Sequence, residues 1–194
     1  MKPRIKIDTT ILFAMIALTG ILFQFPGLYP KHFFINVVLG FLGLTAVLTG
    51  MFLRMSARAY KKARSDNGHE LVTGGPYSLV RNPMYLGTFL IAAGFILIVW
   101  PWYLFPIFAV FFFQRFNIQL RKEEMHLRKI FGASYEAYAR QVPSFFPRFR
   151  DLKRVKWNDV FSVEEMWGTK EKYGLLWAPF LVLILEFLQQ RMIR

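Results

Sequence analysis

The 194-residue sequence contains no cysteine, which excludes disulfides, thiolate nucleophiles and cysteine metal sites. It also has only 3 histidines, and the spacing of His69 and His126 relative to the glutamates matches no metal-binding motif. Charge is absent from three long stretches, which are residues 9–30, 33–53 and 82–114. Because about 20 apolar residues cross a bilayer core, these stretches predict an integral membrane protein. From the spacing of the histidines and glutamates we expect no resident metal.

Acidic residues are scarce as well, at 12 against 25 lysines and arginines, which gives a net charge of +13. The basic residues cluster beside the uncharged stretches, as in residues 54–64 and 121–172. Positive charge is enriched in the cytoplasmic loops of membrane proteins and binds anionic headgroups. We therefore interpret this distribution of basic residues as a consequence of membrane topology, and we expect no nucleic-acid partner.

The predicted fold is all-α, with four transmembrane helices arranged as two hairpins. The basic residues before the first apolar stretch resemble the start of a signal peptide, but we expect an uncleaved span. Trp100-Pro101 divides the long third stretch, since proline breaks a helix and aromatic residues favour the interface. The expected spans are Thr9–Phe25, Phe33–Leu53, Met84–Val99 and Tyr103–Leu120.

Three glycines lie on the second predicted span, at Gly40, Gly43 and Gly50. Small residues allow membrane helices to approach closely, although glycine is also simply tolerated in such helices. After the fourth span, we expect the helix to continue through Glu123-Glu124 and to end at Phe131-Gly132 by a glycine C-cap.

The C-terminal part is harder to assign, because Gly174–Leu185 is apolar over only 12 residues. It is either a fifth span or a helix lying in the interface, and we favour the interface. The expected organisation has three parts: an N-terminal transmembrane hairpin (1–55), a core with the second hairpin and the functional site (56–150), and a C-terminal basic segment with the apolar helix (151–194).

The stretch His69–Gly87 carries most of the interpretable polar chemistry. Gly74-Gly75-Pro76 favours a turn, and Asn82 precedes a proline and is therefore disfavoured in a helix. The predicted topology brings this loop to the same membrane face as Glu123-Glu124. Irregular polar backbone next to a membrane is costly unless it lines a site, so we expect a ligand site here.

The loop offers aromatic side chains, turn amides and Arg81, while the helix offers paired carboxylates. A ligand with an ammonium group, a carboxylate, an aromatic base and a sulfonium group would use all of these. S-adenosylmethionine has these groups, although other zwitterions share some of them. Simpler interpretations are that Glu124 pairs with Arg128 on a solvated helix face and that Tyr77 and Tyr85 anchor the interface.

Two ordered motifs resemble those of integral-membrane methyltransferases, namely the isoprenylcysteine carboxyl methyltransferases and the phospholipid N-methyltransferases. The first is Gly75-Pro76-Tyr77-x-x-Val80-Arg81-Asn82-Pro83-x-Tyr85-x-Gly87. The second is Glu123-Glu124-x-x-Leu127, followed by Phe131-Gly132-x-x-Tyr135-x-x-Tyr138-x-x-x-Val142-Pro143. The resemblance covers residues 68–147, somewhat under half of the chain.

The resemblance implies that S-adenosylmethionine is the methyl donor and that a lipid-like acceptor enters sideways from the bilayer. It assigns cofactor contacts to His69, Glu70, Leu71, Val72, Tyr77, Asn82, Pro83, Met84, Tyr85 and Glu123. We also expect catalytic contributions from Arg81, Tyr85 and Glu124.

Two departures from the family pattern leave the acceptor open. The carboxyl methyltransferases usually have histidine at the position of Asn82 and a substrate-contacting arginine at the position of Gln119. Nearby Arg115 and Arg121 are candidate replacements for that arginine. An ammonium acceptor must first lose a proton, for which His69, Glu124 and His126 are candidate bases.

The sequence therefore predicts an S-adenosylmethionine-dependent membrane methyltransferase acting on a lipid or isoprenylcysteine-like amphiphile. One alternative is a phosphatidylethanolamine-type N-methyltransferase, and another is a non-enzymatic protein that binds anionic lipid. We expect the cell (inner) membrane as the location, with the cofactor site facing the cytoplasm.

Overall fold

A computed structural model describes residues 17–29, 33–65, 70–148 and 157–160, together with positions 166, 177, 180, 184, 187 and 191. The described residues are helical or irregular, with no strand among them. Residues 17–22 are helical, and the later elements are η1 (Pro26–Leu28), α2 (Phe33–Arg64), α3 (Pro76–Leu79), α4 (Pro83–Val99), η2 (Trp102–Leu104), α5 (Phe105–Gln141) and α6 (Trp157–Val160).

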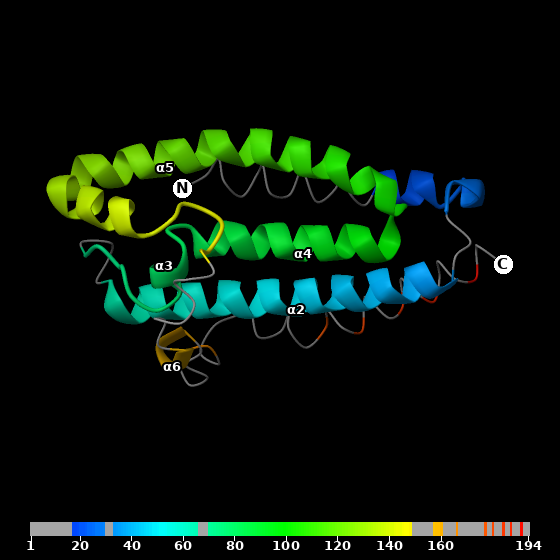
Figure 1. Ribbon diagram of the computed structural model, residues 1–194, viewed down its shortest axis with the longest axis horizontal. Helices are drawn as coiled ribbons and strands as arrows, with labels where there is room; N and C mark the ends of the chain where they lie inside the picture. The colour runs from blue at the N-terminus through cyan, green and yellow to red at the C-terminus, as the bar shows by residue number, and fades with distance from the viewer. Residues whose placement is uncertain are drawn as a thin grey trace.

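Three long helices form the body of the protein, with α4 between α2 and α5 (Figure 1). The predicted third span coincides with α4 to within one residue, and Trp100-Pro101 ends it as expected. By contrast, α2 continues through the basic residues to Arg64, so the second predicted span and the basic segment after it are one uninterrupted helix. His69 and the first predicted span before residue 17 lie outside the described residues.

Glycines bring α2 and α4 into close contact. A Cβ atom added to Gly94 would lie 2.4 Å from the carbonyl oxygen of Gly43, and one added to Gly50 would lie 2.6 Å from that of Gly87. Real Cβ atoms do not approach so closely, so these positions require glycine. The expected close approach at Gly43 and Gly50 is therefore confirmed.

Aromatic rings fill the space between α4 and α5. Phe89 of α4 lies at the centre, and its ring centroid is 5.0–6.4 Å from those of Phe108, Phe112, Phe113, Phe145 and Phe146. Pairs of rings at such distances stabilise a fold beyond their buried area, by about 0.5–1.5 kcal/mol each. Since Phe145 and Phe146 follow α5, they also fold the chain after that helix back onto α4.

The turn back occurs at Gly132, which has a φ of 49° inside α5. A side chain is strained at positive φ, whereas glycine adopts it freely. The chain reverses there and continues as a short helix to Gln141, at the left end of Figure 1. The predicted break at Phe131-Gly132 is confirmed.

The opposite end of α4 is held by residues 17–29. The indole nitrogen of Trp100 donates to Thr19 Oγ1 at 2.9 Å, and the Tyr103 hydroxyl donates to the Leu28 carbonyl at 2.8 Å. Trp100 is buried, so it is a core residue rather than an interface anchor. Trp102 and Tyr103 remain exposed, as the sequence predicts for interface aromatics.

Near the basic end of α2, α6 lies on the side away from α4 (Figure 1). Ser56 Oγ donates to the carbonyl of Val160, and both residues are buried. Met166 packs beside them against Met55 and Ala59. The described positions from 177 to 191 are helical, but they do not decide between an interfacial helix and a fifth span.

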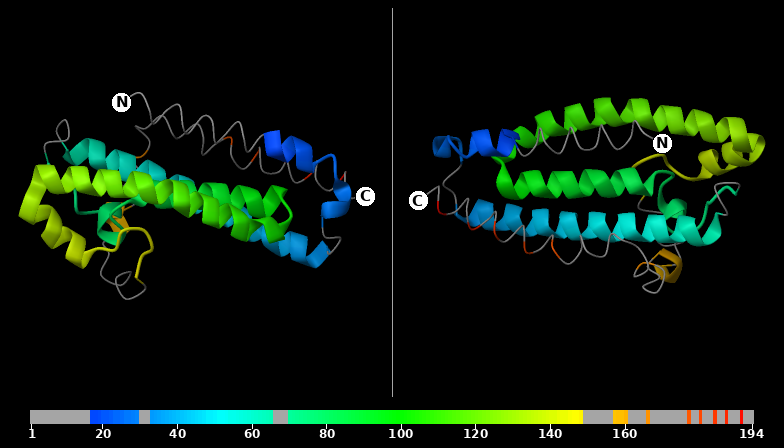
Figure 2. Two further views of the ribbon diagram at one scale, coloured as in Figure 1. Left: turned by 90° about the horizontal axis from the view of Figure 1, so that it is seen from above. Right: turned by 180° about the vertical axis from the view of Figure 1, so that it is seen from behind.

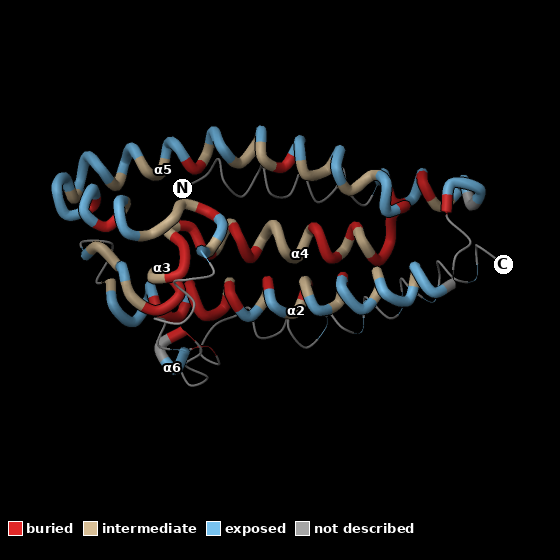
Figure 3. The backbone as a smooth tube through the Cα atoms, in the orientation of Figure 1, coloured by how far each residue is buried: buried red, intermediate tan, exposed pale blue. Residues whose placement is uncertain are grey.

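Burial is concentrated on α4, whereas the outer faces of α2 and α5 are exposed (Figure 3). These outer faces are strongly apolar, with exposed fractions of 77% for Phe34 and 66% for Phe111. Among the described residues, α2 alone is long and apolar enough to cross a membrane, while α4 is a shorter apolar helix. The four-span topology and the three-part division stay predictions.

We expect Gly94→Ala to destabilise the protein, because the added methyl group overlaps the α2 backbone at Gly43. Overpacking of this kind costs about 1–3 kcal/mol, which thermal unfolding in detergent will measure as a lower Tm. Gly20→Ala is the matched control, since a Cβ there meets nothing within 4 Å. Equal Tm values for the two variants would contradict the close contact.

Candidate functional site

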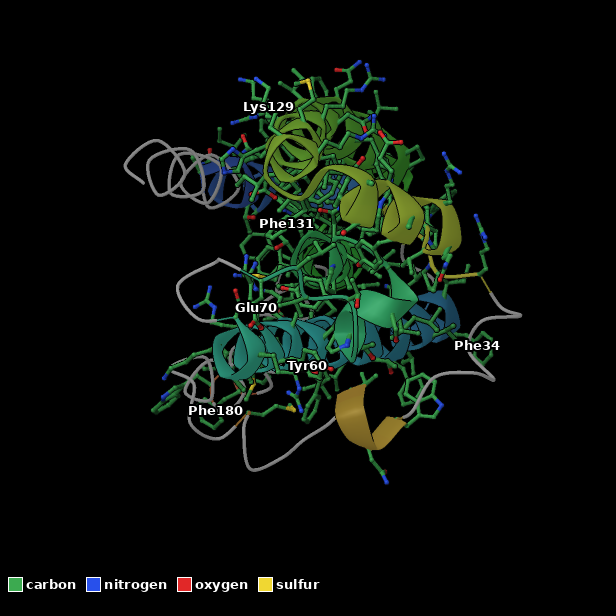
Figure 4. The ribbon with its side chains drawn as sticks, turned by 90° about the vertical axis from the view of Figure 1, so that its left-hand side faces the viewer. Phe34, Tyr60, Glu70, Lys129, Phe131 and Phe180 are labelled. Carbon is green, nitrogen blue, oxygen red and sulfur yellow. The ribbon has the colours of Figure 1, made fainter. Side chains whose placement is uncertain are left out.

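The candidate site lies where the basic end of α2, the loop from Glu70 to Asn82 and the second half of α5 come together. Figure 4 views the molecule from this end, with Glu70 between Tyr60 of α2 and Phe131 of α5. The site is therefore built by the end of α2, by the loop that follows it and by the second half of α5, which is distant from both in the sequence.

The loop makes the turn that the glycines predict. Gly75 has a φ of 54°, which favours glycine, and Pro76 then occupies the first turn of α3. A Cβ on Gly74 would lie only 2.3 Å from the hydroxyl oxygen of Tyr60, so the loop passes directly over α2.

An ion pair joins the loop to α5. Arg81 Nη2 lies 3.0 Å from Glu124 Oε1, and the two side chains are only 13% and 18% exposed. Arg81 Nη1 also donates to the Ala139 carbonyl at 2.9 Å, so the guanidinium bridges both halves of α5 across the Gly132 kink. The sequence predicted that the loop and the two glutamates share one face, and the structure brings Glu124 into direct contact with the loop.

Asn82 extends this bridge to the segment after α5. Its Nδ2 donates to the carbonyl of Ser144 at 3.1 Å and to Glu124 Oε1 at 3.3 Å. The Ser144 hydroxyl donates to the same Glu124 oxygen at 2.7 Å, and the backbone N–H of Arg81 donates to the Pro143 carbonyl at 2.8 Å. One largely shielded carboxylate thus holds the loop, α5 and the residues after it in one arrangement.

Tyrosines form a second link across the site. The Tyr138 hydroxyl donates to the Tyr77 carbonyl at 2.6 Å, and the Tyr77 hydroxyl donates to the Ala57 carbonyl at 3.3 Å. The short helix after the Gly132 kink is thereby tied through α3 to α2. Burial raises the pKa of Tyr77 to about 12, against a smaller lowering by Arg58, and burial also raises the pKa values of Tyr138 and Tyr135.

Sequence reasoning identified Tyr135 and Tyr138 only as motif residues and missed Ser144. The signal for Ser144 was its place directly after the Val142-Pro143 pair. At the site, two buried polar atoms, Arg81 Nε and Tyr135 Oη, have no hydrogen-bond partner among the described residues. Each can donate to an oxygen atom of a polar ligand.

The predicted cofactor residues differ in exposure. Pro83 and Asn82 are buried at the start of α4, while six others are half-buried: Leu71, Val72, Tyr77, Met84, Tyr85 and Glu123. The Tyr85 ring meets that of Phe116 edge-on at 5.4 Å. Glu70 is exposed, and its carbonyl accepts from Ser65 at 3.5 Å.

The other predicted residues lie on α5. Arg115 is half-buried, whereas Arg121 and His126 are exposed. The structure therefore places Arg81, Asn82 and Glu124 in one hydrogen-bonded group and leaves Arg115, Arg121 and His126 outside that group. No cluster of three or more His, Cys, Asp or Glu side chains able to hold a metal occurs within the described residues.

Fold and site together define an all-helical protein with a candidate membrane span and a polar site at its basic end. A family model described as phospholipid methyltransferase matches residues 33–134, which include α2, α4 and Glu124. The chain therefore belongs to the phospholipid methyltransferase family. The kinship predicted from the two motifs is confirmed.

Two similar curated proteins have names that describe methyltransferases. The chain is 33% identical over 131 residues to protein-S-isoprenylcysteine O-methyltransferase B of Arabidopsis thaliana, covering 63% of this chain and 64% of the relative. It is 31% identical over 112 residues to protein-S-isoprenylcysteine O-methyltransferase of Schizosaccharomyces pombe, covering 56% and 48%.

A third relative has a different name. Nickel-cobalt-cadmium resistance protein NccN of Alcaligenes xylosoxydans xylosoxydans is 33% identical over 112 residues, covering 58% of this chain and 50% of the relative. The matches thus span about half to two thirds of the length of these relatives. No solved structure matches the chain significantly.

We expect Arg81→Gln and Glu124→Gln each to lower the free energy of unfolding by about 1–3 kcal/mol, because each leaves a mostly buried charge without its partner. The double variant is expected to lose less than the sum, and denaturant unfolding of all four proteins gives the coupling energy. Glu136→Gln, at an exposed position of α5, is the control. Strict additivity would argue against the ion pair.

High pH is expected to destabilise the protein through Tyr77. Its pKa is about 12 in the folded protein against 10.0 ordinarily, so its contribution is complete below pH 10 and is lost as the pH rises towards 12. Tyr77→Phe removes the ionisable group, and its stability will fall less steeply over this range. Unfolding midpoints measured between pH 9 and pH 12 check this, and parallel curves for both proteins would contradict it.

Proposed function

We propose that the protein transfers a methyl group from S-adenosylmethionine to an amphiphilic acceptor in the membrane. The observation that carries the proposal is the Glu124 group, in which a family motif on the loop and another on α5 meet through Arg81 and Asn82. Family membership supports the methyl donor, since methyltransferases of this family generally use S-adenosylmethionine.

The residues around this group fit the donor. Leu71, Val72, Met84 and Tyr85 offer half-buried apolar and aromatic surface for the adenine and methionyl parts, and Glu123 is a carboxylate suited to an ammonium group. When bound, the donor supplies an electrophilic methyl group on its sulfonium sulfur. Arg81 Nη1 and Nη2 already donate to Ala139 and Glu124, so we assign Arg81 a positioning role rather than direct contact with a ligand carboxylate.

The protein contributes orientation and water exclusion. Methyl transfer requires the nucleophile to approach the methyl group in line with the bond that breaks, and correct positioning supplies much of the acceleration. The Glu124 group and the Tyr138–Tyr77–Ala57 link fix the loop relative to α2 and α5, and hence fix Tyr85 at the start of α4. The acceptor would approach between the helices from the bilayer, with the donor entering from the cytoplasm.

The hydrogen bonds of Glu124 affect which kind of methyl acceptor is favoured. Its Oε1 accepts from Ser144 and Asn82 while the carboxylate pairs with Arg81, so it is not free to remove a proton. A carboxylate acceptor needs no general base, which favours O-methylation of an isoprenylcysteine-like amphiphile. N-methylation of a phosphatidylethanolamine-type lipid is the second candidate, favoured by Asn82 and by the description of the matching family model.

The membrane location is part of the proposal. Exposed phenylalanines along α2 and α5 suit contact with lipid, and the basic end of α2 suits the cytoplasmic surface of the cell (inner) membrane. We propose that the candidate site faces the cytoplasm at that end.

We expect Glu123→Ala and Tyr85→Ala to abolish binding of S-adenosylhomocysteine by the purified protein, measured by calorimetry. Glu136→Ala is the control, since that carboxylate is exposed on the same helix. Unchanged affinity in both site variants would contradict the site assignment. Absence of saturable binding by the unaltered protein would favour a non-enzymatic lipid-binding function.

The acceptor is identified by incubating the protein with labelled methyl donor and native lipid extract, followed by mass spectrometry. A methyl ester among the products supports O-methylation, and a methylated amine supports the phospholipid candidate. Labelling that does not depend on the protein would contradict both.

A further inference from the structure

The last turns of α2 are buried on a face that is exposed earlier along the same helix. Phe41, Thr45 and Phe52 lie on the outer face of α2 and are exposed. Ser56 and Ala59 follow Phe52 by one and two turns on that face. Both are nevertheless buried, at 3% and 4% exposed. Another segment of the chain therefore covers α2 from the level of Ser56 onwards.

The covering segment comes from the C-terminal part of the chain. Ser56 Oγ donates to the carbonyl of Val160 in α6, and Val160 is itself buried. Met166 packs beside it against Ala59. Since the family model ends at residue 134, this cover lies outside the part of the chain that the family model matches.

The same turn of α2 anchors the loop of the candidate site from another side. The Ala57 carbonyl accepts from the Tyr77 hydroxyl, and Gly74 passes directly over Tyr60. In the right-hand view of Figure 2, α3 lies above the end of α2 and α6 lies below it. Because Ser56 and Ala57 are adjacent, the contact with α6 and the anchor of Tyr77 are one residue apart.

Small side chains make this part of α2 narrow. Ser56, Ala57 and Ala59 are all at most 4% exposed, and small residues let neighbouring segments approach a helix closely. No long side chain of these three residues separates the α2 backbone from its neighbours, and close-packed interiors transmit strain. A shift of α2 at α6 is therefore also a shift of the carbonyl that holds Tyr77.

We propose that α6 and Met166 position the S-adenosylmethionine site, and that Ser56 is the positioning residue through which they act. This inference rests on the proposed function and adds an element that the family match does not cover. The bond from Ser56 to Val160 holds the end of α2, so that Ala57 keeps Tyr77 and its loop in the arrangement that binds the donor. Without this support, fewer molecules have the binding arrangement, and the apparent affinity falls with that fraction.

The test compares two double variants of the purified full-length chain in detergent. Ser56→Ala with Met166→Ala removes one buried hydrogen bond and one buried apolar side chain at α6. Thr19→Ala with Leu22→Ala removes the same two kinds of contact at the opposite end of α4, where Thr19 accepts from Trp100. Both variants are expected to have a lower Tm, so the control matches the loss of stability.

Two measurements separate positioning from stability. The α6 variant is expected to bind S-adenosylhomocysteine about fivefold more weakly in calorimetry, since one lost hydrogen bond shifts an equilibrium by this order. Hydrogen exchange is expected to be faster in the peptide containing Tyr77 and Ser78, whose amides donate to Gly74 and Gly75. The variant at the opposite end is expected to match the unaltered protein in both measurements. Ser56→Thr keeps a hydroxyl group and is expected to retain both properties.

The single variant Ser56→Ala is expected to show both effects to a smaller degree, and it decides the question if the double variant does not fold. A lower Tm with unchanged affinity and unchanged loop exchange, as in the control, would mean that α6 only stabilises the fold. That result would overturn the inference.

Hydrogen exchange also separates this inference from the proposed function. If the unaltered protein binds no S-adenosylhomocysteine, the proposed function fails, and faster loop exchange in the α6 variant would still show that α6 positions the loop. If the unaltered protein binds S-adenosylhomocysteine and the α6 variants change neither affinity nor loop exchange, the proposed function stands and this inference fails.

Discussion

The ion pair between Arg81 and Glu124 is the interaction on which the site depends. Both side chains are largely shielded from water, so neither charge is satisfied without the other. Ser144 and Asn82 complete the coordination of the carboxylate, and Ala139 accepts from the second guanidinium nitrogen. One carboxylate holds the loop to α5 and to the residues directly after α5, which is why we assign this group to positioning rather than to proton transfer.

The helical body supplies the fixed framework for that group. Facing glycines allow the backbones of α2 and α4 to touch, and there is no space for a side chain between them. The distance between these two helices is therefore fixed. On the other side of α4, phenylalanine rings set the position of α5. A polar site at one end of such a body can be rigid although its own backbone is irregular. Orientation of two substrates, which methyl transfer demands, is a task for a site of this kind.

Much of this arrangement could be predicted from the sequence, because the signals are local. Pro101 and Gly132 act on their own backbone, and the structure has a helix end at the first and a kink at the second. The basic segment after residue 53 shows the limit of such reasoning. The loss of apolar character there ends the predicted span at Leu53, but nothing in the segment stops a helix, and α2 continues to Arg64.

The helical class, the main breaks between helices and the family can all be inferred from the sequence, since periodicity, proline, glycine and ordered motifs are properties of short segments. Which glutamate meets the loop, that Ser144 joins it and that Trp100 is buried depend instead on how the helices pack. Adjacent residues on a helix point in directions about 100° apart, so Glu123 and Glu124 are alike in sequence and differ only once α5 has packed. The packing of α5, and not the sequence pattern, determines which groups surround each carboxylate.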